Sequence, residues 1–282
     1  MRFAKGHGTG NDFVILPDPD GTLPLTPAFV AALCDRRRGI GADGVLRVVR
    51  SAAHPDAEAS AAGAEWFMDY WNADGSQSEM CGNGVRVYAR YLAEAGLVDP
   101  EGTFDLVTRA GVVPVTMGEE ITAGMPVPRV YVQSDAQVAG RDFTGTAVDV
   151  GNPHLVCAVE TAFLGELDLS QAPGIDPLIF PAGVNVEFAA VGPAPDGADL
   201  YRRMRVYERG SGETQSCGSG ACAVAAVAVH HAGLENGTVV VDVLGGRLTV
   251  TVSPTECLLR GPAVIVAHGD VDAQAVRQLV FS

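Results

Sequence analysis

Two cysteines stand in matching surroundings at the start of two helix-like segments. Cys81 lies in Met80–Gly84 (MCGNG) and Cys217 lies in Ser216–Gly220 (SCGSG). Unpaired backbone N–H groups and the helix dipole favour a thiolate at a helix N-terminus, so we expect a lowered thiol pKa at both positions. Two such thiols predict an acid and a base that act on opposite faces of one substrate.

The sequence around these cysteines is repeated in the two halves of the chain. Asn72 precedes Cys81 by nine residues, and Glu208 precedes Cys217 by nine. Each helix-like segment ends at a glycine, fifteen and sixteen residues after its cysteine. Two asparagines precede the cysteines by seventy and sixty-five residues: Asn11 and Asn152. This matched spacing indicates an internal duplication in which each half positions one thiol.

A thiolate and a thiol on opposite sides of a carbon can invert its configuration, because one removes a proton while the other donates one. The α-proton of an amino acid is weakly acidic, so its removal without a cofactor requires stabilisation of the carboxylate. Helix N-termini supply N–H donors for this, and small residues let a carboxylate approach them: Gly82, Asn83, Gly218 and Ser219. Glu208 and Arg209 can anchor an ammonium and a carboxylate.

The composition excludes several classes of partner. The chain has 282 residues and a formal net charge of −15, which argues against nucleic acid and anionic membranes. The longest wholly apolar stretch, Ala221–Val229, is too short to span a bilayer. The N-terminal residues lack the apolar core of a signal peptide, so we expect a cytoplasmic protein.

The other cysteines fit neither a disulfide framework nor a metal site, and we expect no metal. There is no C-x-x-C, and a spacing of five residues puts Cys217 and Cys222 on different faces of a helix. Four cysteines lie in apolar runs and are expected in the core: Cys34, Cys157, Cys222 and Cys257. Lys5 is the single lysine, at the start of an expected strand, so pyridoxal phosphate, which needs a Schiff-base lysine, is not expected either.

The patterns predict an α/β (α+β) fold of two pseudo-symmetric domains, each a bent, mostly antiparallel sheet around one central helix. We expect one domain over 1–127, to which residues 265–282 return, and another over 128–264. Helices are expected at 26–37, with Thr26 as N-cap, at 81–95 and at 217–233. Strands are expected at 2–5, 13–16, 45–49, 66–71, 104–108, 112–117, 127–133, 147–150, 155–160, 184–190, 204–208, 238–243, 247–252 and 264–267.

The central helices are expected to differ in burial. Val85, Tyr88, Leu92 and Ala95 form an apolar stripe on the first. The second is apolar on every face, and we expect it to be buried on all sides.

Seven motifs of the chain resemble those of the diaminopimelate epimerase family. They span nearly the whole chain: His7–Val14, Asn72–Ser76, Met80–Arg86, Gly151–His154, Asn185–Phe188, Glu208–Thr214 and Ser216–Cys222. The resemblance implies a cofactor-independent epimerase that interconverts LL- and meso-2,6-diaminopimelate on the bacterial route to lysine and peptidoglycan. It also implies a homodimer that binds a small amino-acid substrate.

The resemblance further implies roles for individual residues. Cys81 and Cys217 would be the two bases. The pairs Gly82–Asn83 and Gly218–Ser219 would cradle the carboxylate of the reacting centre. His154 and Glu208 would lie close to the thiols and help to set their protonation. Six side chains would line the substrate: Asn11, Asn72, Asn152, Asn185, Glu208 and Arg209.

The chain departs from the family pattern at three places, none of which touches the cysteines. Some members carry Gln where Gly44 stands, so a polar contact from that position is in doubt. Glu119–Glu120 replaces a more usual proline, and 51–65 is expected to be an exposed insertion.

Two other functions are compatible with the residues. A proline or hydroxyproline racemase of the same fold would have little use for the Glu208–Arg209 pair. A redox protein would use a Cys81–Cys217 disulfide, but that class usually carries C-x-x-C. We expect such a disulfide to be an inactive oxidised state.

Overall fold

The structure is a computed structural model that describes residues 1–57 and 63–279. The chain divides into two compact units, Met1–Ala123 with Pro262–Ser282, and Gly124–Gly261. The expected insertion 51–65 holds two short 3₁₀ segments, Ser51–Ala53 and Pro55–Ala57, and its residues 58–62 lie outside the described residues. In the described parts of the chain, no helix is both long and apolar enough to cross a membrane.

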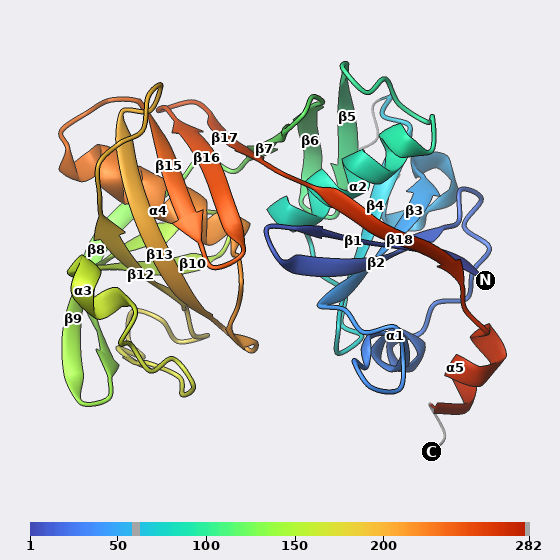
Figure 1. Ribbon diagram of the computed structural model, residues 1–282, viewed down its shortest axis with the longest axis horizontal. Coiled ribbons are helices and arrows are strands. Elements are labelled where there is room, and N and C mark those ends of the chain that lie inside the picture. Colours follow the sequence, from blue (N-terminus) through green and yellow to red (C-terminus); the bar gives the residue numbers. More distant parts are fainter. Residues whose placement is uncertain (58–62, 280–282) are drawn as a thin grey trace. The chain divides into compact units, whose positions relative to one another are not determined.

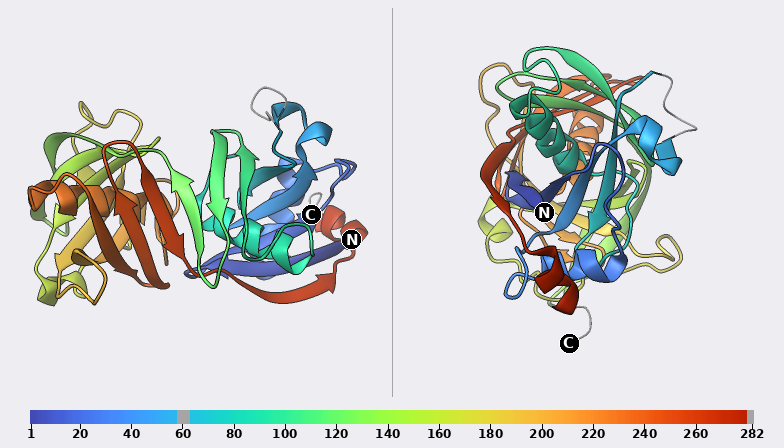
Figure 2. Two further views of the ribbon diagram at one scale, coloured as in Figure 1. Left: turned by 90° about the horizontal axis from the view of Figure 1, so that it is seen from above. Right: turned by 90° about the vertical axis from the view of Figure 1, so that its right-hand side faces the viewer.

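The first unit is a mostly antiparallel sheet that curves around a central helix, α2 (Figures 1 and 2). Its elements are β1 (Arg2–Gly8), β2 (Asn11–Pro17), α1 (Pro27–Cys34), β3 (Gly44–Arg50), β4 (Trp66–Asn72), α2 (Gly82–Glu94), β5 (Thr103–Thr108), β6 (Gly111–Thr116), β7 (Ile121–Met125), β18 (Val264–Asp270) and α5 (Ala273–Leu279). The strands pair in the order β18–β1–β2–β3–β4–β5–β6–β7. The β2–β3 and β4–β5 pairs are parallel and the others antiparallel.

The second unit has the same plan around a central helix, α4. Its elements are β8 (Arg129–Val138), β9 (Arg141–Asp149), β10 (Pro153–Ala158), α3 (Thr161–Leu164), β11 (Gly174–Ile175), β12 (Asn185–Val191), β13 (Leu200–Glu208), β14 (Gly212–Glu213), α4 (Gly218–His231), β15 (Gly237–Val243), β16 (Gly246–Val252) and β17 (Cys257–Gly261). The strands pair in the order β8–β9–β10–β12–β13–β15–β16–β17. The β10–β12 and β13–β15 pairs are the parallel ones.

The strand orders of the two units match strand for strand. β1 to β7 correspond to β9, β10, β12, β13, β15, β16 and β17, and the parallel pairs fall at the same places in both. Because α2 and α4 also follow equivalent strands, the predicted fold class of two pseudo-symmetric α+β units is confirmed.

The central helices differ in burial, as the sequence predicts, with one exception. Val85, Tyr88 and Leu92 of α2 are each 0% exposed, but Ala95 is exposed and lies beyond the last helical turn, as the C-cap. The inclusion of Ala95 in the stripe was therefore wrong. In α4, eleven of fourteen residues are buried, so the prediction of an all-round buried helix holds except at its ends.

Several predicted elements and boundaries were wrong, in part because pairing in the sheet extends strands beyond their apolar residues. β7 and β17 were missed, and β8 begins at Arg129 rather than Val127. The polar turn 151–154 is shorter than predicted, because Pro153 and His154 already pair with β9. The first helix has the predicted N-cap, Thr26, but ends at Cys34.

Candidate active site

Each of the two cysteines is the N-cap of its unit's central helix. Cys81 caps α2 with φ −146° and ψ 116°, and Cys217 caps α4 with φ −119° and ψ 114°. Each sulfur accepts a hydrogen bond from the backbone N–H three residues further on, at 3.4 Å from Gly84 and at 3.4 Å from Gly220. The two thiols therefore share one local geometry at the start of a helix.

In the first unit, two asparagines surround the half-buried Cys81. Its thiol lies 3.7 Å from Asn11 Oδ1, which also accepts a hydrogen bond from Asn83 Nδ2 at 3.2 Å. Asn11 Nδ2 donates to Asp43 Oδ2 at 2.8 Å. An ionised carboxylate only accepts hydrogen bonds, so Asp43 holds the Asn11 amide with its oxygen toward the thiol.

A buried arginine lies under the first turn of α2. Arg86 is 0% exposed and donates to Gly82 O at 3.2 Å and to Asn83 Oδ1 at 2.8 Å. A β-carbon on Gly8 would lie 3.2 Å from Arg86 Nη2, so the glycine allows β1 to pack closely on this turn. Sequence reasoning gave Arg86 no role, although a charged residue beside the apolar positions of a buried helix was a usable signal.

Asn72 lies at the same end of the sheet as Asn11. Strand register places Asn72 opposite Gly44 on β3, and β2, which begins with Asn11, is the other neighbour of β3. Asn72 Nδ2 donates to Ser76 Oγ at 3.0 Å. A β-carbon on Gly44 would lie 2.5 Å from Trp71 O, so a longer side chain there would require the neighbouring strand to shift.

In the second unit, Cys217 is nearly buried, at 6% exposed, and its sulfur lies 3.6 Å from Ser219 Oγ. Burial raises the pKa of the Cys217 thiol well above its ordinary value, and the carboxylates of Glu208 and Glu187 raise it further. The hydrogen bonds from Ser219 and the Gly220 N–H lower it, but they do not compensate. The expectation of a lowered pKa at this position was therefore wrong, because desolvation outweighs the helix N-terminus.

A histidine and a carboxylate form a fully buried pair near Cys217. His154 Nδ1 lies 2.7 Å from Glu187 Oε1, and both residues are 0% exposed. His154 Nε2 lies 3.0 Å from Asn152 Oδ1, so the structure brings these two predicted site residues together. Glu187 was not predicted as a site residue, although it lies two positions after Asn185 and so faces the same side of β12.

The remaining predicted residues of this unit gather at the end of β13. Asn185 Oδ1 accepts the backbone N–H of Arg209 at 2.9 Å, and Arg209 Nη1 donates to Ala182 O at 2.9 Å. Thr214 Oγ1 donates to Glu208 Oε1. Because Asn185 also pairs in register with His154, residues of β10, β12 and β13 meet at one end of this sheet.

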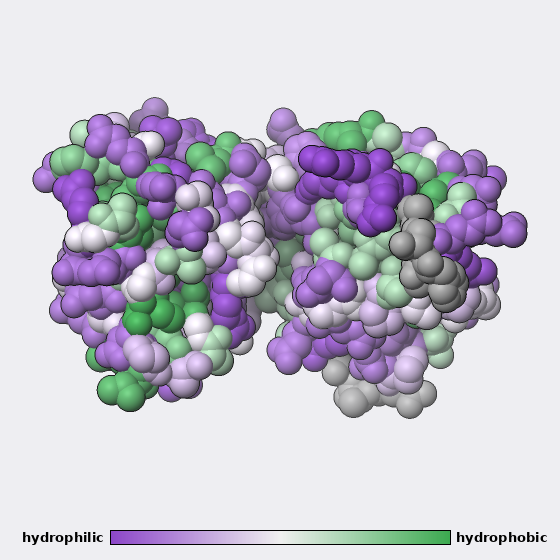
Figure 3. Space-filling view, turned by 90° about the horizontal axis from the view of Figure 1, so that it is seen from below, coloured by the Kyte–Doolittle hydropathy of each residue, from purple (hydrophilic) through white to green (hydrophobic). Residues whose placement is uncertain are grey.

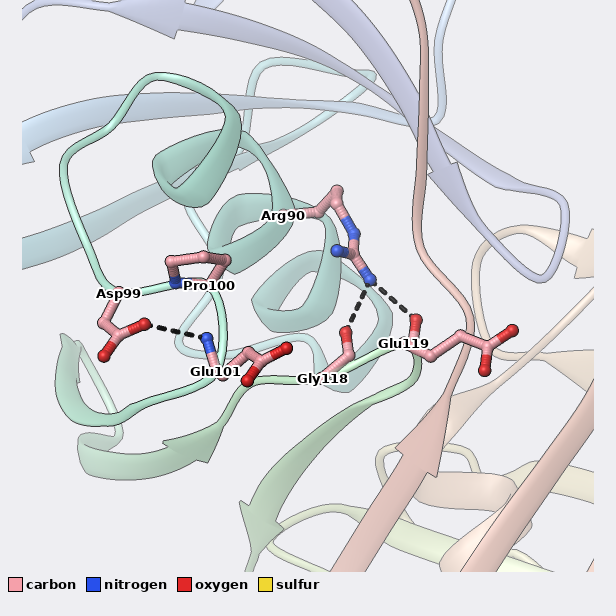
Figure 4. A pocket seen from close by; sticks show the side chains of 6 residues that line it. All are labelled: Arg90, Asp99, Pro100, Glu101, Gly118 and Glu119. Atoms are coloured by element: carbon pink, nitrogen blue, oxygen red, sulfur yellow. Dashed lines mark hydrogen bonds between the residues drawn. The ribbon is translucent and has the colours of Figure 1, made fainter.

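A separate hollow in the first unit does not involve these residues. It has a volume of about 670 Å³ and is lined by Arg90, Asp99, Pro100, Glu101, Gly118 and Glu119 (Figure 4). The guanidinium of Arg90 donates hydrogen bonds to backbone carbonyls, at 3.0 Å to Gly118 O and 2.7 Å to Glu119 O. We assign this hollow no role in the chemistry of the thiols.

The four cysteines expected in the core are all buried: Cys34, Cys157, Cys222 and Cys257. Burial raises the pKa of Cys34 and of Cys157 to about 12, so neither is a ready nucleophile. The single lysine is also committed to structure. Lys5 Nζ donates to Asp12 Oδ2 at 2.6 Å and to the carbonyl of Gly41.

Comparisons with known proteins extend the likeness from motifs to the whole chain. Residues 3–129 and 146–271 match the family model described as diaminopimelate epimerase. The diaminopimelate epimerase of Rhodococcus erythropolis is 49% identical and covers 96% of both chains, and that of Thermobifida fusca is 52% identical and covers 98% of this chain and 100% of its own.

Among solved structures, the fold is shared with more distant proteins. A hydroxyproline epimerase from Agrobacterium vitis matches 95% of this chain and 91% of its own, with a TM-score of 0.66 and 17% identity. A PhzF-family phenazine biosynthesis protein from Bacillus anthracis covers 96% and 99%, with a TM-score of 0.68 and 17% identity. Identities this low show the fold alone, whereas the family match and the close relatives settle membership: this chain belongs to the diaminopimelate epimerase family.

Proposed function

We propose that this chain interconverts LL- and meso-2,6-diaminopimelate, with Cys81 and Cys217 as the two bases. The observation that carries the proposal is that each unit presents one cysteine as the N-cap of its central helix, with the same N–H···S contact. One sulfur as thiolate removes the α-proton, and the other as thiol donates a proton to the opposite face. The reverse reaction exchanges the two roles.

The helix N-termini stabilise the negative charge that builds on the substrate carboxylate. Backbone N–H groups at Gly82–Asn83 and at Gly218–Ser219 belong to the first turns of α2 and α4, where such groups have no intrahelical partner. They donate to the carboxylate of the reacting centre as charge develops on it. A preorganised donor at an oxyanion contributes about 10²–10³ in rate.

The polar side chains at the two sheet ends bind the rest of the substrate. Asn11, Asn72 and Asn152 donate or accept through their amides. Asn185 Oδ1 accepts the Arg209 N–H, and the Asn185 amide nitrogen is the donor that we assign to substrate. Glu208 and Arg209 bind the ammonium and the carboxylate of an amino-acid centre.

His154 and Glu208 act on the protonation of the thiol in the second unit. Glu208 raises the pKa of Cys217 by its negative charge. His154, on β10, also helps to set the protonation of this thiol.

The reaction needs no pyridoxal phosphate. A Schiff base would require the amine of Lys5, which is the chain's single lysine and is held on β1 by Asp12. The helix N-termini supply the stabilisation of negative charge that such a cofactor would provide, and the thiols move the protons.

A homodimer, a cytoplasmic location and a place in lysine and cell-wall precursor synthesis belong to the same proposal. Val264 and Val266 on β18 are 46% and 56% exposed and offer apolar surface for a second copy. On the face drawn in Figure 3, apolar residues form small areas among hydrophilic ones. Light scattering coupled to size-exclusion chromatography tests the dimer, which a single species at 29.2 kDa would contradict.

The activity is tested by isotope exchange in deuterated water. The protein is incubated in parallel with LL-diaminopimelate and with L-proline, and deuterium at the α-carbon is measured by mass spectrometry. We expect incorporation with LL-diaminopimelate together with formation of the meso isomer. Incorporation with proline alone would contradict the proposal and favour the proline racemase alternative.

A further inference from the structure

A buried carboxylate lies against the first turn of α4, and it is not among the residues that the reaction above requires. Glu187 Oε1 is bonded to His154 Nδ1 at 2.7 Å, and Oε2 has no hydrogen-bond partner among the described residues. A carboxylate that is fully buried with one oxygen unpaired is costly, so its presence needs a reason.

Gly220 connects this carboxylate to the thiol. A β-carbon on Gly220 would lie 2.6 Å from Glu187 Oε1, so the carboxylate rests directly on the helix backbone at that residue. The N–H of the same glycine donates to Cys217 Sγ at 3.4 Å. The carboxylate end of the pair is thus turned toward Cys217, while the imidazole end is turned toward Asn152.

The equivalent positions in the first unit are apolar. On the parallel strands β2 and β3, Phe13 pairs with Gly44 and Ile15 with Leu46, just as on β10 and β12 His154 pairs with Asn185 and Val156 with Glu187. Phe13 therefore corresponds to His154, and Leu46 corresponds to Glu187.

The first unit also repeats the contact between this strand position and the first turn of the central helix. Leu46 Cδ2 lies 3.3 Å from where a β-carbon on Gly84 would stand, which is the place that Glu187 occupies against Gly220. Leu46 and Phe13 are both 0% exposed. The same fold therefore packs well without a hydrogen-bonded histidine and carboxyl group at this place, so packing does not explain Glu187.

We propose that the Glu187 carboxylate, oriented by His154, makes Cys217 the thiol that rests protonated, and that Glu187 is therefore a positioning residue for the two-base reaction. The inference rests on the proposed function. Burial raises the pKa of the Glu187 carboxyl, and the hydrogen bond with His154 lowers it and so favours the ionised form. The ionised carboxylate disfavours the thiolate of Cys217, whereas Leu46 places no carboxylate at the equivalent position near Cys81. Glu187 thus gives two thiols of equal local geometry unequal protonation before substrate binds.

Other titratable and charged groups lie on the elements that pack against α4. Glu208 on β13 also disfavours the thiolate of Cys217. Burial and the Glu187 carboxylate raise the pKa of the Cys157 thiol on β10. The remaining charged side chains on the strands that pack on α4 are exposed, or are bonded to one another, to β14 or to backbone: Arg129, Asp135, Arg141, Asp142, Asp149, Arg202, Arg203, Arg205, Asp242, Arg247 and Arg260.

The test measures the protonation of Cys217 directly in the full-length protein. The protein is treated with iodoacetamide over a range of pH, and alkylation of the peptides that carry Cys217 and Cys81 is followed by mass spectrometry. Three variants are compared with the unchanged protein: Glu187→Gln, the double variant His154→Phe with Glu187→Leu, which copies the first unit, and Glu213→Gln. The last removes a carboxylate of the same unit that is paired with Arg205.

We expect the pH midpoint for Cys217 alkylation to fall by about one unit in Glu187→Gln and in the double variant. The Cys81 midpoint stays constant in every sample, and Glu213→Gln behaves as the unchanged protein. If Glu187→Gln does not fold, the double variant still tests the inference, because replacing both partners of a buried hydrogen bond by apolar side chains can be nearly neutral for stability. A Cys217 midpoint that stays the same or rises in the folded variants overturns the inference. Epimerisation that survives complete alkylation of Cys217 would instead overturn the proposed function.

Discussion

Glu187 Oε1 occupies the space into which a side chain on Gly220 would have to grow, 2.6 Å from the position of its β-carbon. We therefore predict that Gly220→Ala displaces either the carboxylate or the first turn of α4. Overpacking of this kind costs about 1–3 kcal/mol, and the N–H···S contact to Cys217 is weakened with it. Urea denaturation and kcat measure the two effects.

Gly165→Ala is the matched control for this substitution. Gly165 lies in the same unit, has φ −75°, and a β-carbon there meets nothing within 4 Å. The alanine should leave stability and kcat unchanged. Equal effects of the two alanines would show that the carboxylate does not fill the space at Gly220.

The two cysteines should be equally indispensable. Cys81→Ser and Cys217→Ser each replace a thiol by a hydroxyl, which is a far poorer base at neutral pH. Since general acid–base groups contribute about 10²–10⁴ in rate, we expect each variant to lose at least that factor in kcat for both directions. Cys257→Ser, in the core of the second unit, is the control and should alter stability rather than kcat. A single variant with full activity would refute the pairing.

Arg86 should stabilise the first turn of α2. In Arg86→Met, the buried acceptors Gly82 O and Asn83 Oδ1 lose a donor, which costs about 1–3 kcal/mol. Arg37→Met removes an exposed guanidinium of the same unit and should change the free energy of unfolding by less than about 0.5 kcal/mol. Chemical denaturation of both variants checks this, and an Arg86→Met protein as stable as Arg37→Met would contradict it.

The acid stability of the first unit should depend on Asp12. Burial alone would raise the pKa of the Asp12 carboxyl, but hydrogen bonds from Arg36 and Lys5 hold it well below its ordinary value. A pKa that is lower in the folded than in the unfolded state adds stability above the unfolded value, near pH 4, which is lost as the pH falls further.

Asp12→Asn should therefore lower the free energy of unfolding at pH 7, and its difference from the unchanged protein should shrink below about pH 4. Asp20→Asn, at an exposed side chain, is the control and should follow the unchanged protein at every pH. Thermal unfolding from pH 7 to pH 3 measures both. A difference for Asp12→Asn that grows toward low pH would have the wrong sign.

The framework of the site could be predicted from local sequence. A cysteine followed by glycines and then by apolar residues at helical spacing predicts an N-cap, and the structure places Cys81 and Cys217 in that position. The matched spacing predicted the duplication, because equal numbers of residues between a strand end and a helix start produce equal geometry.

Properties that depend on contacts between residues far apart in the sequence could not be predicted in the same way. The pKa of Cys217 was assigned the wrong sign, because the depth of its burial depends on strands far away in the sequence. Arg86 and Glu187 were missed for the same reason. Each is a charged residue on an otherwise buried face, and its partner lies on a turn or strand that only the fold brings near.

The most direct test of the account is where deuterium appears first. LL-diaminopimelate is converted in deuterated water, the reaction is stopped at a few per cent conversion, and the α-carbons of product and recovered substrate are analysed separately. With two bases, the product receives its proton from a thiol equilibrated with solvent, so the account predicts deuterium in the meso isomer and none in the recovered LL isomer. Deuterium in the recovered substrate as early as in the product would show one base serving both faces, and would contradict the role of Cys81 and Cys217 as a pair.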